Sequence, residues 1–384
     1  MAGIEAELHE TAVLEAGYHD FGDDLYREGL QRLLEAIDAS GYTTEERWRI
    51  RKRFVVTVLR SRLYSQRGWQ ERPECLRMKL RPPLIILGMP RTGTTALHNM
   101  IAVDRGFQGL NGWLVFYPMP RPPRYLWSSI REYRLRVEVC KAALHPDNKL
   151  KAIHLRTADD VDEALELEAQ AFVSNMFPGV CHLPDYDTWL HAQRQVAVYS
   201  RLADNLRLIG SNEPEKPWLL KNPDHLLAID DLLEVFPDAR IVWTHRHPAP
   251  AMASVSSLLS GVRRGILGAQ VGIDDIPQRE VEVWSKGVSK AMALRDRHPA
   301  CFHDVDYNEF VIDPIGVIRR IYDRFDISLD PTTERAMRAW LAANPQRKYG
   351  VHSYGSLPSV SDAQIEQQFA AYIERFRLTK EPAV

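Results

Sequence analysis

One short segment constrains the fold more than any other part of the chain. Residues 84–87 read Leu-Ile-Ile-Leu, an apolar run without alternation that follows two prolines. Such a run is typical of a strand buried on both faces of a parallel sheet. Residues 88–95 then read Gly-Met-Pro-Arg-Thr-Gly-Thr-Thr, and a helix is predicted after them. A strand, a glycine-containing loop and a helix in this order form the unit from which α/β sheets are built.

The loop of this unit has the composition of a phosphate cradle. Gly88 and Gly93 allow backbone N–H groups to point into one concave nest. The helix that follows adds the positive end of its dipole. We therefore predict phosphate binding by the loop residues Gly88, Pro90, Arg91, Thr92, Gly93, Thr94 and Thr95.

The remainder of the chain supports an α/β sheet. Short apolar runs at 218–220 and 240–244 predict further strands, and helices are expected at 224–236 and 249–259. Helices are also predicted at 25–37, from Thr43 to about Tyr64, at 157–176 and at 362–375. The predicted fold is α/β, with a P-loop-like central parallel sheet flanked by helices. We expect a helical N-terminal segment, 1–80, packed on an α/β domain, 81–384.

Composition excludes some classes of function. The chain has 384 residues, with 49 Lys+Arg against 51 Asp+Glu and a formal net charge of −2, so a nucleic-acid-binding protein is not expected. No apolar run reaches the length of a membrane helix, and residues 1–9 lack the pattern of a signal peptide. The four cysteines lie far apart without a CxxC pair, which disfavours disulfides and zinc. A cytoplasmic location is the expectation.

The loop departs from that of nucleotide triphosphatases. Such a loop carries Lys at position 94, where it reaches the β- and γ-phosphates, but here the residue is Thr94. The strand at 240–244 is followed by His245 and Arg246 rather than by a magnesium-binding Asp. The sequence keeps a phosphate cradle without this magnesium equipment, which disfavours a kinase.

Two motifs together resemble the sulfotransferases that use 3′-phosphoadenosine 5′-phosphosulfate (PAPS). The loop at 88–95 is similar to the family's 5′-phosphosulfate loop. Arg246, with Ser254 eight residues later, resembles the family's site for the 3′-phosphate. An arginine leaving a strand and a serine in the next helix can converge on one dianionic phosphate.

Two further motifs resemble a bacterial group related to protein-tyrosine sulfotransferases. Residues 219–225, Leu-Leu-Lys-Asn-Pro-Asp-His, are similar to an LK-x-P-x-H segment. Residues 344–350, followed by His352 and Tyr354, resemble a late basic loop that closes over the nucleotide. The resemblance runs from about residue 20 to the end. It implies PAPS as co-substrate without a metal, and it adds Arg347, Lys348 and Gly350 to the expected nucleotide-binding residues.

The resemblance also implies roles in sulfuryl transfer. Negative charge grows on the bridging oxygen of the leaving phosphate, and a nearby cation with backbone donors stabilises it. Arg91 and Lys221 are the expected cations. Lys221 follows a predicted strand, at the carboxyl edge where ligands gather in open α/β sheets.

The general base is the part of the pattern that this chain lacks. Relatives commonly place a Glu after a Trp soon after the first helix, but here Leu114 follows Trp113. The remaining candidates are His154, Glu163, Glu166, His182, Asp185 and His225. We favour His154, since a histidine titrates near neutrality, and we interpret Glu163 and Glu166 most simply as solvated helix residues.

Aromatic residues suggest the nature of the acceptor. The predicted acceptor pocket draws on Trp113, Phe116, Tyr117, Tyr125, Trp127, Phe172, Phe177, Tyr186 and Trp189. This density favours an aromatic or apolar acceptor, although most of these residues can equally be core. Five arginines, Arg121, Arg124, Arg131, Arg134 and Arg136, either flank a donor channel or an anionic acceptor, or form a solvated face.

The sequence thus predicts a sulfotransferase that acts on a small hydroxylated molecule, such as a phenol, an alcohol or a lipid-like acceptor. A P-loop small-molecule kinase and a non-catalytic nucleotide-binding relative are the alternatives. A homodimer is compatible with the sequence.

Overall fold

The computed structural model describes residues 2–143, 157–345 and 359–380. The strands are β1 Leu84–Gly88, β2 Gln108–Gly109, β3 Trp218–Lys221, β4 Arg240–His245 and β5 Phe302–Asp306. The helices of the first half are α1 Ala2–Ala16, α2 Arg27–Ala39, α3 Thr44–Ile50, α4 Thr57–Glu71, α5 Thr94–Ile101, α6 Arg131–Ala143, α7 Leu165–Glu168, α8 Met176–Val180 and α9 Pro184–His191. Those of the second half are α10 Val196–Ile209, α11 Ile229–Val235, α12 Pro248–Leu267, α13 Ile276–Arg297, α14 Tyr307–Ile312, α15 Pro314–Arg324, α16 Pro331–Ala343, α17 Asp362–Gln368 and α18 Ala370–Phe376. Shorter turns of helix are η1 Arg51–Val56, η2 Pro73–Arg77, η3 Arg124–Ser129, η5 Ala169–Ala171, η6 Pro223–Leu226 and η7 Pro299–Cys301.

The sheet is the part of the fold that aligns the predicted site residues. Its five strands run in the order β2-β3-β1-β4-β5, and every neighbouring pair is parallel. In this register Gly88 of β1 lies opposite Thr244 of β4, and Ile86 lies opposite Lys221 of β3. Parallel strands bring their carboxyl ends to one edge. The predicted α/β fold is confirmed, and the phosphate loop, Lys221 and Arg246 leave the same edge of the sheet.

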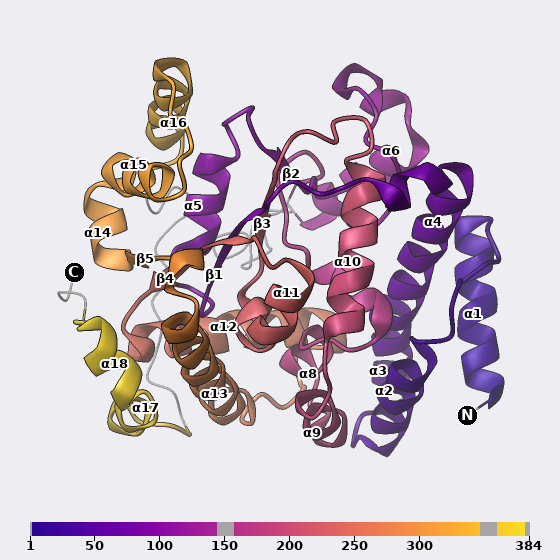
Figure 1. Ribbon diagram of the computed structural model, residues 1–384. Helices are drawn as coiled ribbons and strands as arrows, with labels where there is room; N and C mark the ends of the chain where they lie inside the picture. The colour runs from indigo at the N-terminus through magenta and orange to yellow at the C-terminus, as the bar shows by residue number, and fades with distance from the viewer. Residues whose placement is uncertain (1, 144–156, 346–358, 381–384) are drawn as a thin grey trace.

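Each face of the sheet is covered by helices. Alternate β1 residues point to opposite sides, so Ile86 joins a core with Met100 of α5 and Ile318 of α15. Ile85 joins the larger core on the other face, together with Trp284 of α13. Figure 1 shows α15 and α16 on one side of the sheet and α11, α12 and α13 on the other. All five β1 residues are buried, as the unbroken apolar run predicts.

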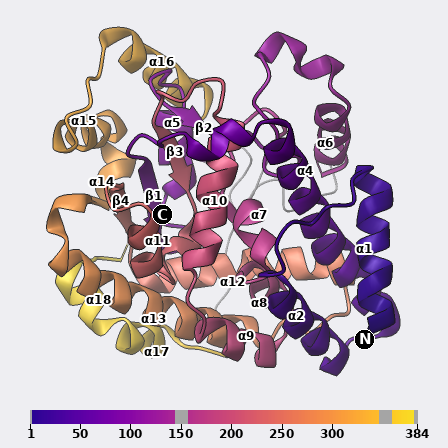
Figure 2. The ribbon, with the colours of Figure 1, turned by 45° about the vertical axis from the view of Figure 1, so that its right-hand side comes forward.

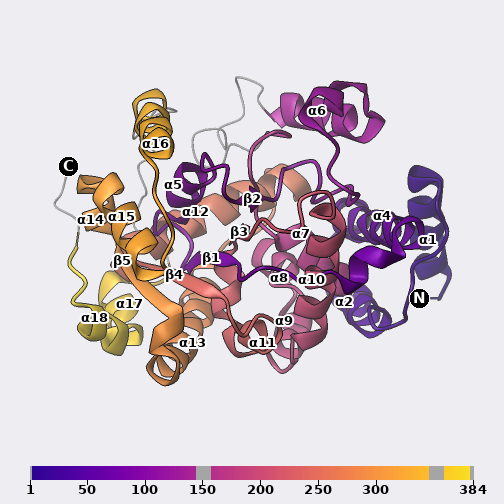
Figure 3. The same ribbon diagram turned by 45° about the horizontal axis from the view of Figure 1, so that its top comes forward.

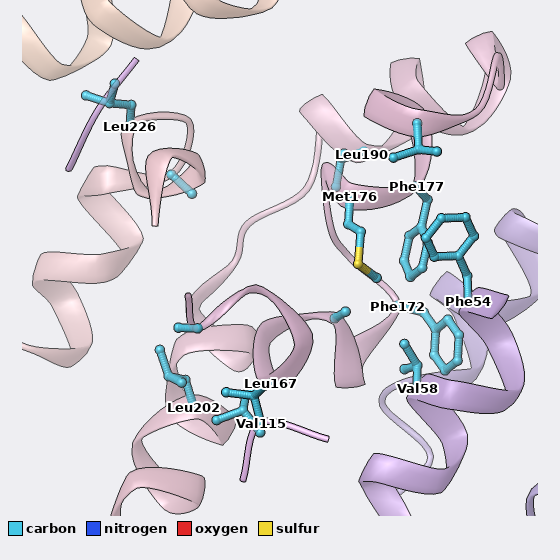
Figure 4. Close-up of a cluster of buried hydrophobic side chains, with 14 of the residues drawn as sticks. Phe54, Val58, Val115, Leu167, Phe172, Met176, Phe177, Leu190, Leu202 and Leu226 are labelled. Carbon is cyan, nitrogen blue, oxygen red and sulfur yellow. The ribbon is translucent and has the colours of Figure 1, made fainter. Parts of the chain in front are cut away.

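The N-terminal helices lie beside the sheet domain, at the right of Figure 2. The helix predicted from Thr43 begins there with a capping box, in which Thr43 and Glu46 satisfy each other's backbone N–H groups. It continues through α3, η1 and α4. Phe54 of this long helix meets Phe177 of α8 edge-to-face, with 5.9 Å between the ring centres, and Figure 4 shows the two rings side by side. The division of the chain at residue 80 stays a prediction.

Three predicted helices differ from the structure. Only α7 and η5 form within the helix expected at 157–176, because residues 158–162 instead run beside residues 110–113. Backbone bonds join Asp162 N to the Leu110 carbonyl at 2.7 Å and Trp113 N to the Ala158 carbonyl at 3.2 Å. These long-range bonds outcompete local helical propensity. The helix at 224–236 divides into η6 and α11, and the one at 362–375 divides into α17 and α18.

Along residues 2–143, 157–345 and 359–380, no helix combines the length and the apolar character that crossing a bilayer requires.

Candidate active site

The phosphate loop begins at Gly88, which packs closely against Thr244. A Cβ at this position would lie 2.3 Å from Thr244 Oγ1, and Gly88 has φ +155°. Thr92 Oγ1 donates to the Met89 carbonyl at 2.7 Å and lies 2.6 Å from Thr244 Oγ1. Gly93 precedes α5 in the left-handed region with φ +88°. The loop therefore turns tightly enough to leave the first N–H groups of α5 directed at its concave side.

Arg91, Arg246 and Ser254 come together beside this loop. Arg91, a non-glycine residue with φ +71°, donates from Nε to Ser254 Oγ at 2.9 Å. Arg246 donates from Nη1 to the Arg91 carbonyl at 2.6 Å, and its guanidinium lies 4.3 Å from the centre of the Tyr307 ring. Arg246 follows β4, and Ser254 lies in α12. The predicted placement of these two residues, at a strand end and in the next helix, is confirmed, and Arg91 links them through its backbone carbonyl and its side chain.

Lys221 is a buried cation at the end of β3, with only 3% of its side chain exposed. Its ammonium donates to Thr95 Oγ1 at 3.1 Å and forms an ion pair with Glu163. Burial and the charge of Lys221 lower the pKa of neighbouring His98 to about 3, so this histidine stays neutral. Lys221 thus joins the phosphate loop to a carboxylate.

A mostly apolar cavity of about 710 Å³ is lined at one end by Thr95 and Glu163, the two partners of Lys221. One wall is a stripe of α12, because Val255, Leu258, Leu259, Val262 and Ile266 share a helix face. The remaining apolar lining comes from Phe54, Phe116, Val139, Cys140, Leu165, Met176, Val180 and Trp284. Pro90, Arg91, Thr94 and Thr95 of the loop form its near end. A cavity of this size accommodates a small organic molecule.

Carboxyl groups gather at the end of the cavity that Glu163 lines. Glu163, Glu166, Asp224 and Glu280 all line it. Burial, together with the charges of Glu163 and Glu280, raises the pKa of Asp224 to about 7, although Asn175 donates to it at 3.1 Å. Behind them, burial raises the pKa of Glu168 to about 8. Burial at this end of the structure therefore favours the protonated form of Asp224 in the cavity lining and of Glu168 behind it.

Among the base candidates in the described residues, Glu163 lies beside the predicted catalytic cation, Lys221. Its side chain is 12% exposed and contacts Lys221, so the interpretation as a solvated helix residue is wrong. Glu166 is also buried, with Arg53 Nη2 3.6 Å from its Oε1. Residues 158–162 pair with 110–113 and thereby place Glu163.

The other base candidates lie elsewhere. His182 is exposed and sits 3.1 Å from Asp275, and Asp185 is exposed on α9. His225 is fully buried, and burial lowers its pKa to about 3. His154 lies outside the described residues, as do Arg347, Lys348 and Gly350 of the predicted basic loop.

The predicted aromatic lining is wrong for eight of its nine residues. Only Phe116 lines the cavity. Trp113, Tyr117, Trp127, Phe172, Phe177 and Tyr186 are buried in the core, Trp189 packs against it, and Tyr125 is exposed. Aromatic side chains stabilise a protein most when their large apolar area is buried, so most of these residues lie in the core. The cavity wall is instead largely aliphatic.

Of the five arginines that the sequence analysis grouped together, one lines the cavity. Arg136 lines the cavity and stacks 3.8 Å from the centre of the Phe116 ring. Arg121 is largely buried over Trp218, and burial lowers its pKa to about 10. Arg124 pairs with Asp159 at 3.2 Å, and Arg131 and Arg134 are exposed.

Sequence reasoning missed the contribution of the helix that begins at Thr43. Its basic face looks solvated in the sequence, yet Arg53 lines the cavity together with Phe54. It also underestimated α12, whose apolar stripe extends beyond the predicted end at 259 to Ile266. The i, i+3, i+4, i+7 spacing of that stripe was the available signal.

Leu114 is fully buried and does not line the cavity. We therefore predict that Leu114→Glu destabilises the protein by about 3 kcal/mol or more, because an ionisable group would enter the core. Urea unfolding of this variant, beside the volume-conserving Leu114→Met, measures the effect. Unchanged stability with raised activity in Leu114→Glu would contradict the account and indicate a lost base at this position.

Comparisons with known proteins agree with the geometry. A family model described as "Sulfotransferase family" matches residues 82–331. The crystal structure of sulfotransferase STF1 from Mycobacterium tuberculosis H37Rv has a TM-score of 0.86 at 34% identity, over 95% of this chain and 98% of that one. The structure of sulfotransferase STF9 from Mycobacterium avium has a TM-score of 0.89 at 26% identity, over 98% of each chain.

A curated relative adds an acceptor to the comparison. The omega-hydroxy-beta-dihydromenaquinone-9 sulfotransferase Stf3 of Mycobacterium tuberculosis is 27% identical over 314 residues. The match covers 79% of this chain and 77% of the relative.

Proposed function

The chain belongs to the sulfotransferase family, and we propose that it transfers the sulfuryl group of PAPS to a hydroxyl of an apolar, lipid-like acceptor. One observation carries the proposal. The Lys221–Glu163 pair lies where the phosphate loop meets an elongated apolar wall. A cation, a carboxylate and an apolar cavity at one junction are what transfer from a nucleotide to an apolar alcohol requires.

The donor side fits a nucleotide with two separate phosphate groups. The nest of loop N–H groups and the hydroxyls of Thr94 and Thr95 would hold the 5′-phosphosulfate. Arg246 and Ser254 would hold the 3′-phosphate. Gly88 supports this fit, since a Cβ there would clash with Thr244 and close the cradle. Arg91 already donates to Ser254, so the two phosphate sites adjoin.

In the transfer step the acceptor oxygen attacks sulfur as the bond from sulfur to the bridging oxygen breaks. The departing bisphosphate gains negative charge on that oxygen. Lys221, Arg91 and the loop N–H groups would stabilise this charge. Because Lys221 is buried beside Thr95, its charge acts in a medium that screens it poorly.

Glu163 is our assignment for the general base. A carboxylate paired with Lys221 stays available to accept a proton, and it lines the cavity that would hold the acceptor. The acceptor proton would pass to Glu163 as the new sulfur–oxygen bond forms.

The acceptor class follows from the cavity wall. Its aliphatic stripe on α12 suits an alkyl or isoprenoid chain better than a polar sugar. The relative Stf3 is named for an omega-hydroxylated menaquinone derivative. We propose an acceptor of that general kind, with a hydroxyl beside Glu163 and an apolar body along α12.

Donor binding is tested by calorimetric titration with 3′-phosphoadenosine 5′-phosphate in the absence of magnesium. We predict binding that Arg246→Ala weakens about 10- to 100-fold, because a charge-assisted contact to a phosphate is lost. Ser254→Ala should weaken it less, since its contact is neutral.

Arg240→Ala is the matched control, since Arg240 starts the same strand at the opposite end. It should bind as the parent does. Absence of bisphosphate binding, or a preference for ATP with magnesium, would favour the kinase alternative. Tight binding without turnover on a broad panel of hydroxylated acceptors would favour a non-catalytic relative.

Catalysis is tested at Glu163. We predict that Glu163→Gln lowers kcat about 10²- to 10⁴-fold while bisphosphate affinity changes little, since general base catalysis contributes that much. Glu166→Gln is the matched control, because Glu166 lines the same cavity but pairs with Arg53. Single-turnover kinetics with PAPS and a long-chain alcohol measure both. Equal losses in the two variants would remove the assignment of Glu163.

A further inference from the structure

We propose that the surface formed by η3 and α6 docks on a membrane that contains anionic lipids, so that the acceptor enters the cavity from the bilayer. The inference rests on the proposed function, because it takes the acceptor to be lipid-like. It concerns a surface outside the Lys221–Glu163 site.

Exposed apolar side chains are concentrated on this surface. Tyr125, Leu126, Leu135 and Val139 are 81%, 40%, 41% and 57% exposed. They make up four of the ten strongly exposed large apolar side chains in the described chain, and all four fall within fifteen residues. The other six are scattered over α1, α3, η2, α14 and the segment before α2. Apolar exposure that gathers in one place marks an interaction surface.

The helix α6 carries these side chains at the periphery of the fold. It packs mainly against η3, and Figures 1 and 3 both show it at the edge of the molecule. Tyr133 and Val137 face the core. Leu135 and Val139 lie one helical turn apart and form an outward apolar stripe, with the cation Arg131 one turn before them. The helix is thus amphipathic, with an apolar stripe presented to the outside.

The exposed apolar stripe is continuous with the acceptor cavity. Val139 is 57% exposed and also lines the cavity. Cys140 and Arg136, its neighbours on α6, line the cavity as well. An apolar molecule in contact with the outer face of Val139 would therefore already touch a residue of the cavity lining.

The charges around the stripe fit an anionic lipid surface. Arg124, Arg131, Arg134 and Lys141 are exposed and Arg136 adds a fifth cation, against three carboxylates, Glu132 beside Arg131, Glu138 beside Lys141 and the Arg124 partner Asp159. The surface is basic although the whole chain has a formal charge of −2. Cations beside inserted apolar side chains are the pattern of helices that lie in the interface of anionic bilayers. This charge pattern favours a membrane over a neutral apolar partner.

Vesicle flotation tests the proposal with the full chain and without donor or acceptor. We expect binding to vesicles of phosphatidylglycerol and phosphatidylcholine that weakens as salt rises, and little binding to phosphatidylcholine alone. Leu135→Glu should lower the bound fraction about fivefold, and Arg134→Glu should lower it comparably.

Two control variants change the same chemistry elsewhere. Ile312→Glu alters a residue that is 83% exposed on α14, and Arg335→Glu reverses an exposed charge on α16. Both should bind vesicles as the parent does. Thermal unfolding of all four variants should match the parent, because each altered side chain is exposed. Absence of vesicle binding by the parent, or equal losses in test and control variants, would overturn the proposal.

Two further measurements separate this proposal from its alternatives. If sedimentation velocity shows a parent dimer that Leu135→Glu dissociates, the surface is an interface between two copies and the membrane proposal fails. Bisphosphate titration tests the donor site independently of vesicles. Donor binding without vesicle binding removes only the docking surface, whereas loss of donor binding removes the proposed function.

Discussion

A buried ion pair organises the centre of this molecule. Lys221 ends a strand that is buried on both faces, so its ammonium leaves water and needs a partner within the protein. Glu163 supplies that partner from a segment 58 residues away in sequence. The pairing of residues 158–162 with 110–113 holds this segment in place. The ion pair therefore connects the sheet to the phosphate loop, through Thr95, and to the polar end of the apolar cavity.

The two halves of the site depend on different kinds of structure. The phosphate side is made of backbone geometry, with Gly88 packed against Thr244 and Gly93 in the left-handed region, and it tolerates little change. The apolar side is made of one helix face and neighbouring side chains, which admit many substitutions of similar size. A site of this kind can keep one reaction while its acceptor changes, because the phosphate loop is fixed and the apolar cavity wall can vary.

The sequence was most informative where local chemistry decides the structure. The structure agrees with the predictions for the unbroken run 84–87, the loop at 88–95 and the placement of Arg246 before Ser254. These predictions succeed because strand burial and loop conformation depend mainly on residues that are adjacent in the sequence. Glu163 and the acceptor wall were not predictable in the same way. Glu163 owes its position to backbone bonds with residues 110–113, and most of the aromatic candidates were taken by the core. Such long-range choices leave weak local signals.

We propose that the acceptor hydroxyl meets the donor at the Lys221–Glu163 pair. A crystal structure of the protein with 3′-phosphoadenosine 5′-phosphate and a long-chain alcohol would test this meeting point. We expect the 5′-phosphate in the loop at 88–95, the 3′-phosphate between Arg246 and Ser254, and the alcohol oxygen within hydrogen-bond distance of Glu163, with its chain along α12. An alcohol bound away from Glu163, or a nucleotide bound outside the loop, would contradict it.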